Sequence, residues 1–266
     1  MDAAEVSDVI GALLRAAGLG PCAAVERIGH GASGDLVFRI EGARLLYAKI
    51  GDPGRRISVA ELARETAALR WLEGRADAAR LVWSGDVLGR PAMLSEAVAG
   101  LALHELGANA AEGGAIVALS ALARLHALPI EACPFDERLG VKLAEARRRV
   151  DAGEIEVDRL DPANVGKPPV EIMAELAARR PASEDLVVTH GDASWPNFVL
   201  RPDGGVTIID LGRFGVADRH QDLALFVRSG KRNFPHLDIE ALVARHYPAR
   251  VSVEKLAFYR QLDELY

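Results

Sequence analysis

The stretch that decides the fold reads His-Gly-Asp-Ala-Ser-Trp-Pro-Asn-Phe-Val at residues 190–199, and Ile-Ile-Asp-Leu-Gly follows at residues 208–212. Asp192 and Asn197 lie five residues apart in the first segment, and Asp210 ends an apolar run in the second. Short apolar runs that flank turn residues are typical of β-strands. The pattern therefore indicates two short strands with polar, chemically capable side chains at their ends.

A turn cluster, Pro-Asp-Gly-Gly at residues 202–205, separates these two segments and predicts a β-hairpin. Closing the hairpin and extending its ladder by one step sets Asn197 opposite Asp210. Two oxygen ligands a few ångströms apart suit Mg²⁺, which binds nucleotide phosphates and keeps some of its waters. We therefore expect Asn197 and Asp210 to hold magnesium, and Asp192 to orient a hydroxyl nucleophile. An Asx-capped hairpin without chemistry is the alternative.

Composition limits the class of protein. The chain has 266 residues, of which 50% are hydrophobic, enough for the core of one large or two smaller domains. A net charge of −6 argues against nucleic acid and favours neutral or cationic partners. Cys22 and Cys133 have neither metal-binding nor disulfide spacing. The acidic start lacks the basic region of a secretory signal, and no uncharged apolar run reaches ~18 residues, so we expect a cytoplasmic protein without a membrane span.

The segment Gly-His-Gly-Ala-Ser-Gly at residues 29–34 fits the pattern G-x-G-x-x-G. In dinucleotide-binding folds this pattern opens a helix. Here it leads into the strand-like residues 36–40, which excludes that interpretation. A strand-turn-strand flap over phosphates fits better, with Ser33 at its tip donating to a phosphate. An ordinary hairpin turn is the alternative.

A helix is predicted over residues 58–72, because apolar residues recur there at three- and four-residue steps. Glu65 flanks this apolar stripe and has no basic residue three or four positions further on. Glu61, in contrast, can pair locally with Arg64. A carboxylate beside a core-facing stripe needs a cation from elsewhere in the chain, and Lys49 at the end of a predicted strand is the natural partner. A solvated helix face is the alternative.

These features resemble the kinase fold, in which an Asp accepts the proton of the substrate hydroxyl, an Asn five residues later holds one magnesium and a later Asp holds the other. The His-Gly-Asp form is similar to that of antibiotic and small-molecule kinases. The resemblance implies a kinase-like α/β fold that uses ATP, or GTP, with Mg²⁺. Residues 1–97 would form a nucleotide-binding lobe of five strands with one helix, and residues 98–266 a mainly helical catalytic and substrate-binding lobe.

The resemblance also implies the residues that bind the nucleotide. Lys49, paired with Glu65, would hold the α and β phosphates. Tyr47 lies on the same face of its strand and would stack on adenine, although a core aromatic is equally compatible with the pattern. The backbone carbonyl of Ser95 and the backbone amide of Ala97 would read the adenine edge, whatever side chains they carry.

Further segments narrow the resemblance to the aminoglycoside phosphotransferases, most closely those that act on the 3′-hydroxyl. The matching segments are residues 125–136, 188–192, 209–213, 215–224 and 258–266. In the 3′ enzymes an acidic pair and the terminal carboxylate line the antibiotic pocket, which implies Asp263, Glu264 and the carboxylate of Tyr266 here. The substrate would be a cationic aminoglycoside, with no nucleic acid, membrane or obligate protein partner.

An acidic loop agrees with a polycationic substrate. Residues 151–161 contain five acidic residues and one arginine, and we expect Asp158 and Asp161 to contact the antibiotic. A solvated acidic loop is the alternative. Arg213 resembles an arginine that lies near the transferred phosphate in the family, and an ion pair with Asp218 is the alternative for it.

His126 is expected to be structural. It stands near the end of a helix predicted over residues 110–128, where a histidine can satisfy the last carbonyl groups.

One segment departs from the family pattern. Residues 226–233 read Phe-Val-Arg-Ser-Gly-Lys-Arg-Asn, whereas the family usually has acidic residues there that contact the drug. Residues 32–39 also look like the streptomycin 3″-phosphotransferases, so a 3″ enzyme remains an alternative. A choline or sugar-amine kinase of the same fold is a second one, although it would not need the acidic terminus. A pseudokinase is disfavoured because the expected catalytic residues are intact.

Overall fold

The computed structural model describes residues 3–30 and 34–266, so the expected phosphate donor Ser33 lies outside the described residues. The chain divides into two compact units. Unit 1 comprises the described residues up to Gly100 together with 201–203 and 207–213, and unit 2 comprises 101–200, 204–206 and 214–266. None of the helices in the described part of the chain is long and apolar enough to cross a membrane.

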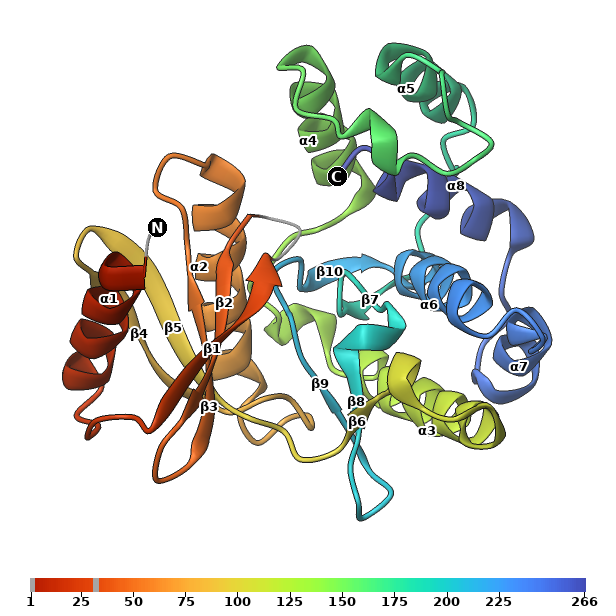
Figure 1. The fold of residues 1–266 in the computed structure, drawn as a ribbon. Helices are drawn as coiled ribbons and strands as arrows, with labels where there is room; N and C mark the ends of the chain where they lie inside the picture. The colour runs from red at the N-terminus through yellow and green to blue at the C-terminus, as the bar shows by residue number, and fades with distance from the viewer. Residues whose placement is uncertain (1–2, 31–33) are drawn as a thin grey trace. The chain divides into compact units, whose positions relative to one another are not determined.

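Unit 1 is built on an antiparallel five-stranded sheet with the strand order β1-β2-β3-β5-β4 (Figure 1). The strands are β1 (Ala24–His30), β2 (Leu36–Glu41), β3 (Leu45–Ile50), β4 (Leu81–Val87) and β5 (Arg90–Glu96). Helix α1 (Ala3–Ala16) contributes Ile10 and Leu13 to a core that also holds Ala48 and Ile50 of β3. Because side chains alternate along a strand, Lys49 between them projects to the opposite face of the sheet.

Helix α2 (Arg56–Leu72) is the helix predicted over residues 58–72, and it begins two residues earlier than expected. Helix α1 is a second helix of unit 1, in addition to the one that the kinase resemblance implied. The predicted apolar stripe is confirmed, since Leu62, Thr66, Leu69 and Leu72 are all buried. Thr66 Oγ1 lies 3.9 Å from Met93 Sδ of β5, and Met93 is the register partner of Lys49. Helix α2 therefore covers the face of the sheet to which Lys49 projects.

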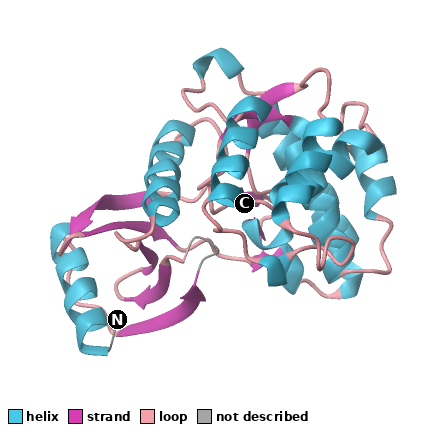
Figure 2. Ribbon diagram, turned by 90° about the horizontal axis from the view of Figure 1, so that it is seen from above, coloured by secondary structure: helices cyan, strands magenta, loops and turns pink. Residues whose placement is uncertain are grey.

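Unit 2 is mainly helical (Figure 2). Its helices are α3 (Ala108–His126), α4 (Leu139–Asp151), α5 (Pro169–Ala178), α6 (Arg219–Asn233), α7 (Ile239–His246) and α8 (Val253–Asp263). Short 3₁₀ helices are η1 (Leu103–Glu105), η2 (Ile130–Ala132), η3 (Val157–Arg159) and η4 (Trp195–Asn197). Its strands include β6 (Leu101–Ala102), β7 (Leu186–Thr189), β8 (Phe198–Leu200) and β10 (Gly215–Asp218), of which β7 and β10 pair antiparallel. The apolar side chains of α6 lie at its centre, with Leu223 and Phe226 fully buried.

The predicted hairpin forms, but it is shorter than the sequence suggested. Strand β9 (Val206–Ile208) neighbours β8 in a three-stranded sheet with the order β6-β8-β9. The strands do not run on to Asn197 and Asp210, because Asn197 lies in η4 and Asp210 has a left-handed backbone with φ 62°. The expectation that these two residues face each other across a β-ladder is therefore wrong in its geometry.

Candidate active site

Lys49 lies between two carboxylates in unit 1. Its Nζ is 2.7 Å from Glu65 Oε2 and 2.8 Å from Asp210 Oδ1. The ion pair with Glu65 predicted from the helix pattern is thus present, and Asp210 completes a group of three charges. Burial alone would lower the pKa of Lys49, but the two carboxylates outweigh it and the pKa is raised. Lys49 therefore remains a cation.

The backbone of residues 207–213 brings Asp210 into unit 1. Ile208 N donates to the carbonyl oxygen of Asp77 at 2.9 Å, and its own carbonyl oxygen accepts from Ala79 N at 3.0 Å. The left-handed backbone of Asp210 is uncommon for a residue other than glycine, and Asp tolerates it better than most. Its side chain is 50% exposed, so the carboxylate that contacts Lys49 also reaches solvent.

Arg213 also lies in unit 1 and pairs with a carboxylate of helix α2. Its Nε donates to Glu61 Oε1 at 2.9 Å. The sequence offered Asp218 as an alternative partner of Arg213, but the carboxylate of Asp218 is bound by His220 and Lys255. Glu61 and Glu65 lie one turn apart on α2, so this helix gives one carboxylate to Lys49 and another to Arg213.

The expected adenine-binding residues lie on β3 and at the end of β5. Tyr47 is half-buried, and it is the register partner of Ser95. The amide of Ala97 donates to the carbonyl oxygen of Leu45 at 3.1 Å. To donate a hydrogen bond to adenine, this amide would therefore have to give up its bond to Leu45.

In unit 2, the catalytic loop, which we define as residues 190–197, holds Asp192 and Asn197 against each other. Asn197 Nδ2 donates to the backbone carbonyl of Asp192 at 3.0 Å and to its Oδ2 at 3.2 Å. Trp195, which is fully buried, packs on Phe226 and Phe234. This apolar anchor holds the turn in which the two polar side chains meet, and it explains why Asn197 is nearly buried.

The start of the catalytic loop is fixed by helix α6. Asp222 accepts from His190 N at 2.7 Å and from Gly191 N at 2.9 Å, and Gln221 Nε2 donates to the Gly191 carbonyl at 2.9 Å. Sequence reasoning missed these anchors. A signal in the sequence was the polar run Arg-His-Gln-Asp at residues 219–222, directly before the apolar residues 223–227.

Three of the expected substrate-binding residues come together at the end of α8. Glu264 Oε2 accepts from the amide of Asp161 at 3.0 Å, and both carboxylate oxygens accept from Asn164 Nδ2. Burial raises the pKa of Glu264, against the effect of these donors. Asp263 lies beside Glu264 in sequence, so the acidic loop and the terminal acids form one cluster.

Arginines of the chain itself contact this acidic cluster. Arg260 Nε donates to Asp161 Oδ2 at 2.6 Å, and Arg228 donates to Asp263 Oδ2 at 2.5 Å. The sequence marked Arg228 only as a departure from the family pattern. A cationic substrate must therefore share these carboxylates with, or displace, resident guanidinium groups.

The remaining expected substrate residues lie apart from these contacts. Asp158 is exposed in η3. Tyr266 turns its side chain to α4, where its hydroxyl donates to the Lys142 carbonyl at 3.1 Å and its ring lies 4.5 Å from Lys142 Nζ.

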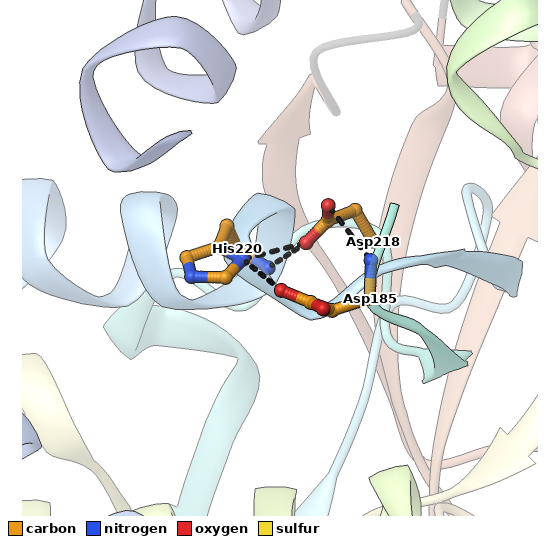
Figure 3. A group of neighbouring side chains, drawn as sticks. All are labelled: Asp185, Asp218 and His220. Carbon is orange, nitrogen blue, oxygen red and sulfur yellow. Dashed lines mark hydrogen bonds and ion pairs between the residues drawn. The ribbon is translucent and has the colours of Figure 1, made fainter. Parts of the chain in front are cut away.

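A separate cluster of titratable groups contains Asp185, Asp218 and His220, whose ligand atoms lie within 4.8 Å of one another (Figure 3). Lys255 Nζ is 3.0 Å from Asp185 Oδ2 and 2.8 Å from Asp218 Oδ2. His220 Nδ1 is 2.6 Å from Asp218 Oδ1, and its Nε2 accepts from Ser252 N at 2.9 Å. The lysine supplies the positive charge and both ring nitrogens are engaged, so this is an internal polar network rather than a metal site.

This network predicts acid sensitivity of folding. Burial alone would raise the pKa of Asp218, but bonds from His220 and Lys255 lower it from 3.8 to about 2. Because the folded pKa is depressed, the stabilisation is present above pH ~4 and is lost as the pH falls toward ~2. Asp218→Asn should therefore be less stable than wild type at pH 5, and roughly 2 kcal/mol of that difference should vanish by pH 2. Urea unfolding at both pH values measures it, and a pH-independent difference would contradict it.

The sheet with its Lys–Glu ion pair and the loop with its Asp–Asn pair define a phosphotransferase of the protein-kinase-like fold. The chain belongs to the Phosphotransferase enzyme family, whose model matches residues 24–259. It is 38% identical over 252 residues to an aminoglycoside 3′-phosphotransferase of Streptomyces fradiae, with 90% of this chain and 94% of that protein covered.

Solved structures agree with this assignment. A crystal structure of aminoglycoside-3′-phosphotransferase of type VIII matches with a TM-score of 0.83 and 33% identity, over 97% of this chain and 99% of that one. The aminoglycoside phosphotransferase APH(3″)-Id from Streptomyces rimosus ATCC10970, in complex with ADP and streptomycin, matches with a TM-score of 0.82 and 28% identity, over 98% of each chain. The kinase-like fold predicted from the two motif segments is thus confirmed.

Proposed function

We propose that this protein is an aminoglycoside O-phosphotransferase that moves the γ-phosphoryl group of ATP to an antibiotic hydroxyl, the 3′-hydroxyl, and so confers resistance. The observation that carries the proposal is the similarity to a 3′-phosphotransferase along 90% of the chain. In the structure, Glu264 of the terminal segment accepts from the amide of Asp161 in the acidic loop. An anionic site of this kind suits a polycationic sugar.

The proposed chemistry assigns a separate role to each group of residues. Lys49, held by Glu65, neutralises charge on the α and β phosphates, and Arg213 lies near the transferred phosphate. Asp192 orients the acceptor hydroxyl. As the new bond from the acceptor oxygen to the γ-phosphorus forms, the bond from that phosphorus to the ADP oxygen breaks, and Asp192 takes the hydroxyl proton. Because the transition state is loose, positioning and charge neutralisation supply most of the rate.

The donor set fits magnesium. A half-exposed carboxylate at Asp210 and an amide oxygen at Asn197 are ligands that Mg²⁺ uses with nucleotide phosphates. Asn197 turns its Nδ2 toward Asp192, which leaves Oδ1 as its metal-binding atom. When bound, the ion would neutralise charge on the phosphates. We further propose that residues 1–97 bind the nucleotide and 98–266 the acceptor, in the cytoplasm, where ATP is supplied.

A panel of acceptors tests the proposal. Purified protein with Mg·ATP should phosphorylate kanamycin and neomycin, and a 3′-deoxy aminoglycoside should be a poor acceptor. Choline should give no turnover. The position of the new phosphate is read from the product by NMR. Turnover of choline with no turnover of any aminoglycoside would refute the proposal.

A streptomycin 3″-phosphotransferase is a second candidate. The match to the enzyme solved with ADP and streptomycin has a TM-score of 0.82. In this chain residues 226–233 are neutral or basic rather than acidic. A higher kcat/KM for streptomycin than for kanamycin in the same panel would support the 3″-phosphotransferase instead.

The acidic cluster predicts a selective loss of antibiotic affinity. Asp263→Asn removes a carboxylate and leaves Arg228 without that partner, so the site loses one negative charge. Each lost charge contact in a partly wet pocket costs roughly 1–3 kcal/mol, which is about 5- to 150-fold in affinity. We therefore expect KM for aminoglycosides to rise by that factor, while KM for ATP stays within about twofold.

The control for this variant is Glu254→Gln, which removes an equal charge from the first turn of the same helix, where Glu254 accepts from the Ser252 hydroxyl. It should leave both KM values unchanged. Raising the ionic strength should weaken antibiotic binding in the wild type more than in Asp263→Asn, because screening acts on the charge that the variant lacks. Unchanged aminoglycoside kinetics in folded Asp263→Asn would remove this cluster from the substrate site.

A further inference from the structure

His126, which the sequence suggested would bind carbonyl groups at the end of its helix, bonds two side chains instead. Its Nε2 lies 2.9 Å from Asp222 Oδ2, and its Nδ1 lies 2.7 Å from the hydroxyl of Tyr247. The imidazole is buried, with 3% of its side chain exposed. The residue therefore links helices α3 and α6 and Tyr247, the residue that follows α7, through polar contacts in the interior of unit 2.

The partners of the imidazole decide where its protons lie. An ionised carboxylate only accepts hydrogen bonds, so Nε2 carries the proton that it donates to Asp222. Burial raises the pKa of Tyr247 to about 12, so the hydroxyl keeps its proton and donates it to Nδ1. This arrangement gives His126 a single tautomer with both ring nitrogens satisfied.

Asp222 connects this imidazole to the catalytic loop. Its carboxylate is fully buried and also accepts the amides of His190 and Gly191. Burial alone would raise the pKa of Asp222, but the hydrogen bonds from the His126 ring and from the His190 amide help to outweigh it, and the pKa is lowered. Gly191 has φ 90°, so the chain turns sharply between the clamped amides and Asp192.

We infer that His126 is a positioning residue for phosphoryl transfer, which acts through Asp222 on the backbone that carries Asp192. The inference rests on the proposed function, in which Asp192 orients the acceptor hydroxyl. Without the Nε2–H donor, the buried Asp222 carboxylate loses one of its three donors and more readily takes up a proton. A protonated carboxyl group presents an O–H donor where an amide needs an acceptor, so a loop contact weakens and Asp192 shifts. Misplacement of a reacting group by about 1 Å can cost on the order of 10²-fold in rate.

Two substitutions of His126 distinguish the effect of its Nε2–H donor from the effect of the bulk of its ring. His126→Phe keeps the bulk of the ring and removes both nitrogens, whereas His126→Gln retains an N–H donor at the level of Nε2. We expect kcat to fall about 10- to 100-fold in His126→Phe, with KM for ATP unchanged, and to recover to within a few-fold of wild type in His126→Gln. Amide hydrogen exchange at His190 and Gly191 should become faster in His126→Phe and return toward wild type in His126→Gln.

The chain offers a matched control in His220 (Figure 3). This imidazole is similarly buried and binds a carboxylate, Asp218, at the start of helix α6, but its contacts within the described part of the chain do not include the catalytic loop. His220→Phe should lower the melting temperature without changing kcat of the folded enzyme or the exchange at residues 190 and 191. Equal effects of His126→Phe and His220→Phe on kcat would mean that His126 is only structural.

The exchange measurement does not depend on the acceptor. If the wild type phosphorylates no aminoglycoside, the proposed function fails, whereas unchanged exchange in His126→Phe overturns the positioning role by itself. If His126→Phe does not fold, Tyr247→Phe serves instead, because it removes the hydroxyl that fixes the tautomer. We expect kcat in Tyr247→Phe to fall about 2- to 12-fold, the equivalent of one lost hydrogen bond, and no change there would overturn the inference.

Discussion

Replacement of Asp192 by alanine should lower kcat for aminoglycoside phosphorylation by a factor on the order of 10² or more, with nucleotide affinity nearly unchanged. The reason is its place in the structure. Asp192 lies on the catalytic loop of unit 2 and contacts Asn197, whereas Lys49, proposed to bind the phosphates, belongs to unit 1. The variant therefore loses the group proposed to orient the acceptor and keeps the groups proposed to hold the phosphates.

Steady-state kinetics and calorimetry together measure this effect. Asp192→Asn is the sharper variant, because it keeps the size of the side chain and loses only its capacity to take a proton. Asp203→Asn is the control, since Asp203 is an exposed acid at the tip of the β8–β9 turn and pairs with Arg201. Phosphotransfer near the wild-type rate in folded Asp192→Asn would show that this loop is not catalytic.

Removal of the charge at Asp210 should instead damage nucleotide binding and turnover together. Asp210→Asn suits the test, because asparagine also tolerates the left-handed backbone seen at this position, whereas alanine adds strain. We expect the affinity for Mg·ATP and kcat each to fall on the order of 10²-fold, because a metal ligand and a charge beside Lys49 are lost at once. The effect on kcat/KM should exceed that of any other single substitution in unit 1.

Comparison of magnesium-bound and magnesium-free nucleotide isolates the role of the ion. Binding of ADP without magnesium should be weakened far less in Asp210→Asn than binding of Mg·ATP. Asp77→Asn is the matched control, because Asp77 contacts the same segment only through its backbone carbonyl, which accepts from Ile208 N, and through a distant 3.9 Å approach to Arg201. Normal Mg·ATP binding by calorimetry in Asp210→Asn would remove Asp210 from the metal site.

The pattern of residues over short stretches of the sequence predicted helices and strands and one ion pair. Strand alternation put Lys49 on one face of β3, and the stripe on α2 left Glu65 beside that face without a local cation. These features depend on neighbours within a few residues, so they can be predicted directly from the sequence. The hairpin was predicted for the same reason. Its predicted length was wrong because a 3₁₀ turn at Asn197 and a left-handed backbone at Asp210 replace regular strand.

The sequence by itself therefore predicted the Lys49–Glu65 pair from the pattern of nearby residues, and the resemblance of its motifs to those of kinases predicted the kinase-like fold. Only the tertiary structure decided that Glu61 binds Arg213, that Arg228 occupies Asp263, and that His126 and the catalytic loop share one carboxylate. These contacts join residues far apart in the chain. Charged and polar side chains pair with the complementary groups that packing brings within a few ångströms of them. The separation of two residues in the sequence does not predict that distance.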